Sequence, residues 1–365
     1  MQFTKIFTKL ILLSLTGFFA SLTFAAPAIT GTGVVDAPPI LNWELDQGAA
    51  QTPNFNDANS NLLFDFHGSL DTCDVMLSSE GNYHMALKDI WPVYLSKFKE
   101  PLKNAFYSTT PPLVVPQLTN SVLQVGNLYA KCQPSVAVSN KTVIDKLVAM
   151  KAVDGEIYPL FKNRGLVLLV KKGNPKTIHS VWDLGRADIN LITPSTFEPS
   201  VFKVYTDSLY NIAKNDSNPP ADTNADQLFD QMFNGVTGNP KKWLRSARIH
   251  HRDEPWSVAH GNADVAVIYY HLGLFAKQTF PDTFDIISLG GTIDNPNPLP
   301  GTVVTERYVV ALKGKWSRHQ QEARKELIST LRSSEFTRIL EKRGLQRPGG
   351  FIAADYPSNV KLSSN

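Results

Sequence analysis

Short apolar runs alternate with polar loops and helical patterns along most of the chain. In the first part we expect strands at 74–77, 105–107, 135–138, 165–170 and 189–192. Polar loops follow these strands, and the loops after 135–138 and 189–192 lead into helices expected at 142–150 and 201–214. Strand, polar loop and helix in this order are typical of a parallel α/β sheet with its loops at the carboxyl ends of the strands. The pattern therefore predicts an α/β fold.

The same pattern continues to the C-terminal end. We expect strands at 247–250, 264–270, 284–288 and 307–312, and an exposed loop at 215–224. Two amphipathic helices should follow, over 317–332 and on to Arg343, with Gly344 as the cap. Near the start, Pro92 suits the first turn of a helix, so we predict a helix over 92–99. A turn at Gly68-Ser69 should separate 61–67 from the first core strand.

The N-terminal residues have the pattern of a secretory signal peptide. Lys5 and Lys9 precede an apolar stretch, and Thr23 and Ala25 occupy the two positions of a small-x-small cleavage site. A membrane anchor is the alternative, but an uncharged run of about 15 residues is short for a membrane span. We predict residues 1–25 as a signal peptide cleaved near Ala25, and residues 26–60, rich in Pro, Asn, Asp and Gly, as an extended leader. The product should lie in the periplasm or outside the cell.

Length and charge narrow the class of protein further. The 365 residues suggest two domains of roughly 150 residues each. Loss of Lys5 and Lys9 would lower the formal charge from +3 to +1, so no nucleic-acid partner is indicated. We expect a monomer.

Two cysteines, Cys73 and Cys132, remain after the predicted cleavage. An even pair in an oxidising compartment is a candidate disulfide, and each cysteine precedes a predicted strand. Metal ligation is an alternative, but a CxxC spacing is absent, and a catalytic thiol is weaker still.

Motifs of the common enzyme classes are absent from the sequence. We find no GxSxG, Walker loop, GxGxxG, HExxH or paired CxxC. Asp253 and Glu254 beside His251 form an alternative acid–base set, but such neighbours are common on surface loops. We therefore expect no catalytic residues, no cofactor and no metal.

Two segments carry a resemblance to a known family. The first, LVLLVKKGNPKTIHSVWDLGRAD at 166–188, has an apolar strand, a Lys-Gly-Asn-Pro turn and a Leu-x-Arg-x-Asp stretch. The second runs from Ile249-His-His-Arg-Asp-Glu-Pro255 to Gly261-Asn-Ala-Asp264. Both resemble molybdate-type periplasmic binding proteins, and the loops at Gly81-Asn82 and 110–112 resemble one divergent branch of that class.

The resemblance implies a type 2 periplasmic-binding-protein fold, with two α/β lobes joined by two crossover strands and a ligand cleft between them. Lobe 1 would comprise residues 60–169 and 305–350, lobe 2 residues 170–304, and residues 351–365 a C-terminal tail. It also implies capture of a small solute for an ABC-type permease in the inner membrane. The first loop departs from the family pattern at Ser78–Asn82, so molybdate is not implied as the ligand. A ligand sensor for a membrane signalling partner is the alternative.

Loops at the starts of the predicted helices supply candidate ligand contacts. Backbone N–H groups at a helix N-terminus attract anions, and nearby hydroxyl and amide groups add donors. The candidates are Ser78, Ser79, Gly81, Asn82, Thr109, Thr110, Ser139, Asn140, Ser195, Thr196, His251 and Arg252. Such residues are also ordinary helix caps. The predicted ligand is a small anion.

Arg252 offers the fixed fork of donors that suits an oxyanion. Its alternative is a salt bridge to Asp253 or Glu254. His250 and His251, as neighbours in a strand, should point to opposite faces. Glu80 is expected to pair with Arg252 across the empty cleft or to accept a hydrogen bond from the ligand.

Tyr83, Tyr269 and Tyr270 are candidates for the pocket lining or for the core. For lobe closure, we expect hinges near Lys171 and Thr302, with Arg252 and Ser195 closing over the ligand.

Overall fold

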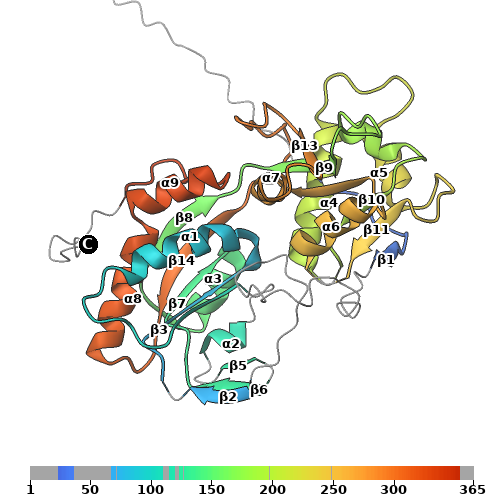
Figure 1. The fold of residues 1–365 in the computed structure, drawn as a ribbon. Helices are drawn as coiled ribbons and strands as arrows, with labels where there is room; N and C mark the ends of the chain where they lie inside the picture. The colour runs from blue at the N-terminus through green and yellow to red at the C-terminus, as the bar shows by residue number, and fades with distance from the viewer. Residues whose placement is uncertain are drawn as a thin grey trace, which may run out of the picture.

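Two large β-sheets, each with its own helices, and one small three-stranded sheet make up the described part of the molecule (Figure 1). The computed structural model describes residues 24–36, 67–70, 72–109, 115–119, 123–125, 127–196, 198–247 and 249–353. The predicted α/β class is confirmed. The predicted signal peptide lies outside the described residues except for Phe24 and Ala25.

One half of the structure, which we call lobe 1 and which includes the C-terminal helices, is built on a five-stranded sheet. Its strands, in spatial order, are β4 (Ala105–Thr109), β3 (Val75–Ser79), β7 (Val136–Ser139), β14 (Glu306–Leu312) and β8 (Val153–Lys162). Side chains alternate between its faces. Val309 packs in the cluster under α1 (His84–Leu95), α8 (Arg318–Leu331) and α9 (Ser334–Lys342), and Val310 in the cluster under α2 (Val115–Thr119) and α3 (Lys141–Ala149). Both faces of this sheet are therefore covered.

The second half, which we call lobe 2, is built on a six-stranded sheet. Its order is β1 (Val34–Asp36), β11 (Trp243–Ser246), β10 (Leu191–Thr193), β12 (Val265–Tyr269), β9 (Leu166–Lys171) and β13 (Phe284–Ser288). The helices of this lobe are η4 (Val181–Gly185), α4 (Pro199–Lys214), α5 (Ala225–Phe233), α6 (His250–His260) and α7 (Tyr270–Thr279). Strand β12 is wholly buried, as its continuous apolar run predicts.

In each sheet, one strand runs antiparallel to both of its neighbours. These strands are β9 in lobe 2 and β14 in lobe 1, and each is the strand by which the chain enters from the other lobe. The sheets are thus mixed rather than purely parallel.

Two crossings between the lobes within the described residues, at 163–165 and 302–305, lie side by side. Asn163 donates to Thr305 from its backbone N–H (3.2 Å) and from its side-chain amide (2.8 Å). Gly165 has φ +83°, and an added Cβ would lie 2.9 Å from Pro298, so the first crossing requires glycine. The first crossing thus lies at 163–165, whereas Lys171, near which we expected a hinge, is paired within the lobe 2 sheet.

Several predicted elements differ in the structure. Residues 250–260 form one helix, α6, where we expected a strand up to His250, a loop over 251–255 and then a short helix. The helix starts early because the carboxylate of Glu198 accepts from the backbone N–H of His250. Helix α1 runs through Pro92 rather than beginning at it, so the carbonyl of Lys88 lacks the donor that residue 92 would otherwise supply. Gly68 and Ser69 lie within a strand rather than a turn. That strand, β2 (His67–Leu70), forms a small sheet with β6 (Asn127–Ala130) and β5 (Leu123–Val125).

Two observations bear on the predicted lobe boundaries, which as a whole stay a prediction. The boundary at 169/170 falls inside β9, and the whole of β9 pairs with lobe 2 strands. The predicted leader contributes β1, which pairs with β11 at the edge of lobe 2, and Asn234 accepts from the N–H groups of Thr30 and Gly31. Residues 30–36 are thus held in place by hydrogen bonds to segments that are distant along the chain.

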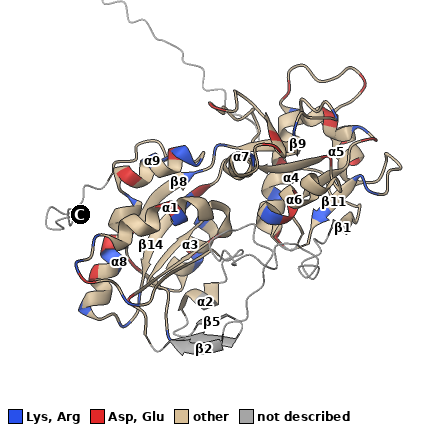
Figure 2. Ribbon diagram, in the orientation of Figure 1, with Lys and Arg blue, Asp and Glu red and all other residues tan. Residues whose placement is uncertain are grey.

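Charged side chains of both signs are interspersed over the two lobes (Figure 2). No helix within the described ranges has the length and apolar character needed to cross a membrane.

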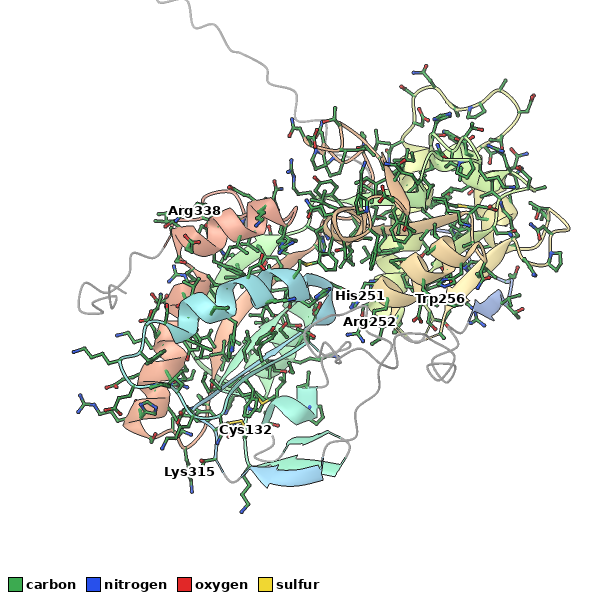
Figure 3. The ribbon with its side chains drawn as sticks, viewed as in Figure 1. Cys132, His251, Arg252, Trp256, Lys315 and Arg338 are labelled. Carbon is green, nitrogen blue, oxygen red and sulfur yellow. A yellow bond between two sulfur atoms is a disulfide. The ribbon has the colours of Figure 1, made fainter. Side chains whose placement is uncertain are left out.

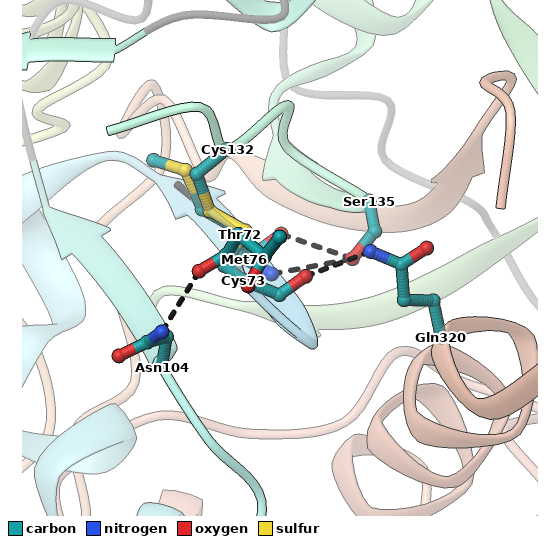
Figure 4. Close-up of a disulfide and its surroundings, with 7 residues drawn as sticks. All are labelled: Thr72, Cys73, Met76, Asn104, Cys132, Ser135 and Gln320. Carbon is teal, nitrogen blue, oxygen red and sulfur yellow. Dashed lines mark hydrogen bonds between the residues drawn. A yellow bond between two sulfur atoms is a disulfide. The ribbon is translucent and has the colours of Figure 1, made fainter. Parts of the chain in front are cut away.

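A disulfide joins Cys73 and Cys132 in lobe 1, as predicted (Figure 4). Both cysteines are buried, and they precede the neighbouring strands β3 and β7. The Gln320 side chain of α8 donates to the carbonyl of Cys73 (2.8 Å). The bridge therefore fixes the starts of two strands whose other ends reach the site described below.

Removal of the disulfide should destabilise lobe 1. The bridge spans 59 residues, and the chain entropy lost by the unfolded state corresponds to about 2–4 kcal/mol. A Cys73→Ala/Cys132→Ala variant should lose free energy of unfolding of that order in urea titrations followed by circular dichroism. The wild type in reductant should behave like the variant, and an unchanged midpoint in either sample would contradict this role.

Candidate functional site

A cavity of about 610 Å³ lies between the lobes. Lobe 1 contributes Glu80, Asn82, the start of α3 and the start of β14, and lobe 2 contributes the start of α4 and Tyr269. These segments lie at the ends of strands β3, β7, β10 and β12 and just after the second crossing. Helix N-termini from both lobes thus open on one cavity.

Glu80 and Arg307 form a buried ion pair at the floor of this cavity. Arg307 Nη2 lies 2.9 Å from Glu80 Oε2. Glu80 Oε1 accepts from the hydroxyl of Ser139 (2.7 Å) and from the side-chain amide of Asn140 (3.2 Å). Burial lowers and the charge of Glu80 raises the pKa of Arg307, and the net shift is upward. Glu80 therefore pairs within its own lobe, and not with Arg252 as expected, because β14 brings Arg307 beside it.

The Nε of Arg307 differs from its two other nitrogens in lacking a partner within the described residues. Its Nη1 donates to the carbonyl of Glu306 (3.1 Å), while its buried Nε has no hydrogen-bond partner among the described residues. Arg307 was not among the predicted site residues. The signal was available in Thr305-Glu-Arg307, a polar start to an apolar strand directly after the predicted hinge.

Helix α3 presents its N-terminus to the cavity from lobe 1. Asn140 is the N-cap, and its side-chain oxygen accepts from the N–H of Val143 (3.1 Å). The first N–H groups of a helix have no partner within it, and they carry partial positive charge. The N–H groups of Lys141 and Thr142 therefore suit an anionic group, and the exposed Lys141 and Lys146 side chains add charge at the rim.

From lobe 2, Glu198 reaches the cavity at the start of α4. Its carboxylate accepts from the backbone N–H of His250 (3.2 Å) and lies 3.1 Å from His250 Nδ1. His250 is fully buried, and Pro199 occupies the first position of α4. The acid thus caps α6 and holds the imidazole, so the N-terminus of α6 is already occupied by a carboxylate of the protein.

Histidines form contacts between the lobes beside the cavity. The rings of His84 (α1) and His251 (α6) stack with centroids 5.6 Å apart. His271 Nε2 lies 2.8 Å from the carbonyl oxygen of Asn82, which can only accept, so this nitrogen carries the proton. Burial lowers the pKa of His271 to about 3, and burial followed by the neighbouring His250 lowers the pKa of His251 well below its usual range. His251 and His271 are therefore neutral at pH 7.

One further carboxyl group is buried nearby without a partner. Both oxygens of Glu254 lack hydrogen-bond partners in the part of the chain that the structure describes. Burial, and then the charges of Glu198 and Asp253, raise the pKa of Glu254 well above its usual range. Glu254 is therefore held neutral inside lobe 2.

Of the twelve predicted contact residues, Asn82 and Asn140 line the cavity. Ser79 donates to the carbonyl of Glu80, and Ser139 to its carboxylate, so both position the loop from behind. Ser78 lies at the end of β3 and is 3.5 Å from Ser108, and Gly81 shares the helical turn η3 (Gly81–Tyr83) with Asn82. The sequence therefore indicated that these residues lie near the site, but it did not indicate which of their side chains face the cavity.

The remaining candidates lie elsewhere around the cavity. Ser195 is buried, and Thr196 accepts from Arg245 (3.2 Å). Thr109 ends β4, and Thr110 lies outside the described residues. His251 and Arg252 lie where α6 begins, at the boundary between the lobes (Figure 3).

Arg252 is exposed and does not line the cavity, since α6 is a helix here and not the predicted loop. For the same reason, His250 and His251 are not on opposite faces of a strand.

Of the three tyrosines that we predicted to lie in the pocket lining or in the core, Tyr269 lines the cavity. The buried Tyr83 donates to the carbonyl of Val138 (3.0 Å), and Tyr270 donates to that of Ile293 (2.7 Å). Among the described residues, no three His, Cys, Asp or Glu side chains gather as they would around a metal ion.

The pKa of His271 predicts a loss of stability on acidification. Unfolded protein takes up this proton near pH 6.5 and folded protein near pH 3, so stability is full above pH 6.5 and falls below it. At pH 5 the loss from His271 should be on the order of 2 kcal/mol.

His271→Gln should flatten the profile of unfolding free energy between pH 7 and pH 5. His260→Gln, a change to an exposed histidine on α6, should leave the profile as it is in the wild type. Comparing variants separates His271 from Glu254, whose raised pKa acts with the opposite sign. Equal slopes for His271→Gln and the wild type would contradict the assignment.

Comparisons with known proteins agree with this architecture. PEB3 of Campylobacter jejuni with bound L-phospholactate is 17% identical and has a TM-score of 0.51, with 75% of this chain and 100% of that chain covered. The sulfate-binding protein SubI of Mycobacterium tuberculosis is 14% identical (TM-score 0.47, coverage 79% and 90%). The periplasmic molybdate-binding protein of Azotobacter vinelandii is 12% identical (TM-score 0.47, coverage 75% and 99%). At such identities the likeness concerns the fold alone.

In sequence, no curated protein matches the chain significantly. The predicted type 2 periplasmic-binding-protein fold is confirmed. A family model described as bacterial extracellular solute-binding protein matches residues 95–346, well over half of the chain. The chain belongs to the bacterial extracellular solute-binding protein family.

Proposed function

We propose that this protein captures a small organic solute with an anionic group between its lobes and does not transform it. The observation that carries the proposal is the cavity of about 610 Å³ on which α3 of one lobe and α4 of the other both begin. Its volume falls in the range of about 300–1,000 Å³ that is usual for organic ligands. Apolar side chains such as Val143, Val201 and Val204 line part of it, which suits a carbon skeleton.

The anionic group would bind on the lobe 1 side of the cavity. There the N–H groups at the start of α3 and the Nε of Arg307 are donors, and Lys141 and Lys146 lie at the rim. Charge-assisted hydrogen bonds of this kind are stronger than neutral ones. In this proposal lobe 1 holds the solute first.

Closure would then bring lobe 2 over the solute. The crossings at 163–165 and 302–305 are the hinge, and α4 with Tyr269 closes the cavity. Such domain closure around a ligand is a common conformational change in two-lobed proteins. The closed form would be recognised by an ABC-type permease, with the protein exported to the periplasm by residues 1–25 and acting as a monomer.

Binding should depend on the guanidinium fork of Arg307. Arg307→Lys keeps the positive charge beside Glu80 but removes the Nε donor, so affinity for the anionic solute should fall about tenfold. Arg252→Lys is the matched control and should change affinity less than about twofold.

The measurement begins with a thermal-shift panel of carboxylates, phosphonates, phosphate esters and neutral sugars. Calorimetry with the best anionic compound then compares the variants, with circular dichroism as the folding check. Stabilisation by neutral sugars alone, or equal affinity for Arg307→Lys and the wild type, would contradict the proposed function.

A further inference from the structure

Among the charged side chains of the inner part of the cavity, carboxylates outnumber cations. Glu80, Asn82, Glu198 and Arg307 all line it and are only 3–7% exposed. Two of these side chains are carboxylates, and one is a guanidinium. The other cations that line the cavity, Lys141 and Lys146, are exposed at the rim. A bare anion entering the inner cavity would therefore meet two carboxylates.

The two carboxylates are not equivalent. Both oxygens of Glu80 are engaged by Ser139, Asn140 and Arg307. Within the described ranges, Glu198 accepts from the backbone N–H of His250 and lies 3.1 Å from its Nδ1. A carboxylate can accept about four hydrogen bonds. Glu198 is thus the inner carboxylate with capacity for a donor from the solute.

Asn82 supplies an independent indication of the same kind. Asn82 lines the cavity, and its buried side-chain Oδ1 has no hydrogen-bond partner within the described segments. The backbone of Asn82 is fixed by His271, which donates to its carbonyl oxygen (2.8 Å). Buried acceptors are nearly always satisfied, by protein, water or ligand. A donor group on the bound molecule would satisfy this one.

The remaining inner group has the opposite requirement. The Nε of Arg307 is a buried donor that lacks a partner among the residues described. It needs an acceptor, and an anionic oxygen suits it best. The inner cavity therefore presents acceptors for a positive group and a donor for a negative group.

We propose that the solute is a zwitterion, with an ammonium group held by Glu198 and Asn82 and a carboxylate or phosphonate held by Arg307 and the start of α3. This inference rests on the proposed function and specifies the class of its ligand. It also assigns Glu198 as a specificity-determining residue. Fully deprotonated inorganic oxyanions, such as sulfate and molybdate, lack the donor and are repelled by the inner carboxylates.

Matched pairs of compounds test the inference on the unmodified protein. Calorimetry would compare L-alanine with propionate, L-glutamate with glutarate, and 2-aminoethylphosphonate with ethylphosphonate. Sulfate and molybdate would be measured in the same series. Within each pair, the first compound carries an ammonium group and the second lacks it. In the pair that fits the cavity, the ammonium-bearing compound should bind roughly 10- to 100-fold more tightly.

Glu198→Gln tests the residue. The amide keeps the shape and an acceptor for His250 but loses the charge, so the preference within that pair should shrink to about threefold or less. Glu335→Gln is the control, because Glu335 lies on α9 and pairs there with Arg338. It should keep the wild-type preference.

The outcomes separate the two proposals. Equal or tighter binding of the organic anions without an ammonium group overturns the zwitterion inference and leaves the proposed function standing. An unchanged preference in folded Glu198→Gln also overturns it. Tighter binding of sulfate or molybdate than of every organic anion contradicts both. Binding of neutral sugars in place of every charged compound contradicts both.

Discussion

The buried ion pair between Arg307 and Glu80 holds the floor of the cavity in place. It joins β14 to the loop after β3, and through Ser139 and Asn140 it also fixes the end of β7 and the start of α3. Loss of one partner from such a pair costs roughly 3–5 kcal/mol, because the other charge stays buried. Arg307 also follows the second crossing between the lobes directly. The pair therefore connects the geometry of the cavity to the hinge.

The distribution of charge in the site follows from this pair. Glu80 neutralises Arg307, so the inner cavity has no excess positive charge to offer a bare anion. The anion-attracting groups that remain are the α3 N-terminus, Arg307 Nε and the rim lysines, while Glu198 occupies the N-terminus of α6. Neutral histidines complete the boundary between the lobes. Selectivity thus depends on where donors and acceptors lie, more than on net charge.

The sequence predicted those elements whose structure depends mainly on residues close to them along the chain. Continuous apolar runs predicted β9 and β12, and polar loops after β3 and β7 predicted where the cavity lies. Elements that depend on distant partners were missed: β8 is an edge strand interrupted by Gly155 and Pro159, and α6 starts at a carboxylate 52 residues away. Arg307 was missed because its role comes from the pairing of β14 with β7, whereas Arg252 had the expected neighbours in sequence but not in space.

Closure of the two lobes around a solute is the central claim, and the distance between the lobes measures it directly. Spin labels at Lys315 in lobe 1 and Val236 in lobe 2, both exposed, would report that distance by pulsed electron resonance. Addition of a saturating solute should shift the distribution to a single shorter distance. The same distribution with and without bound solute would contradict the account.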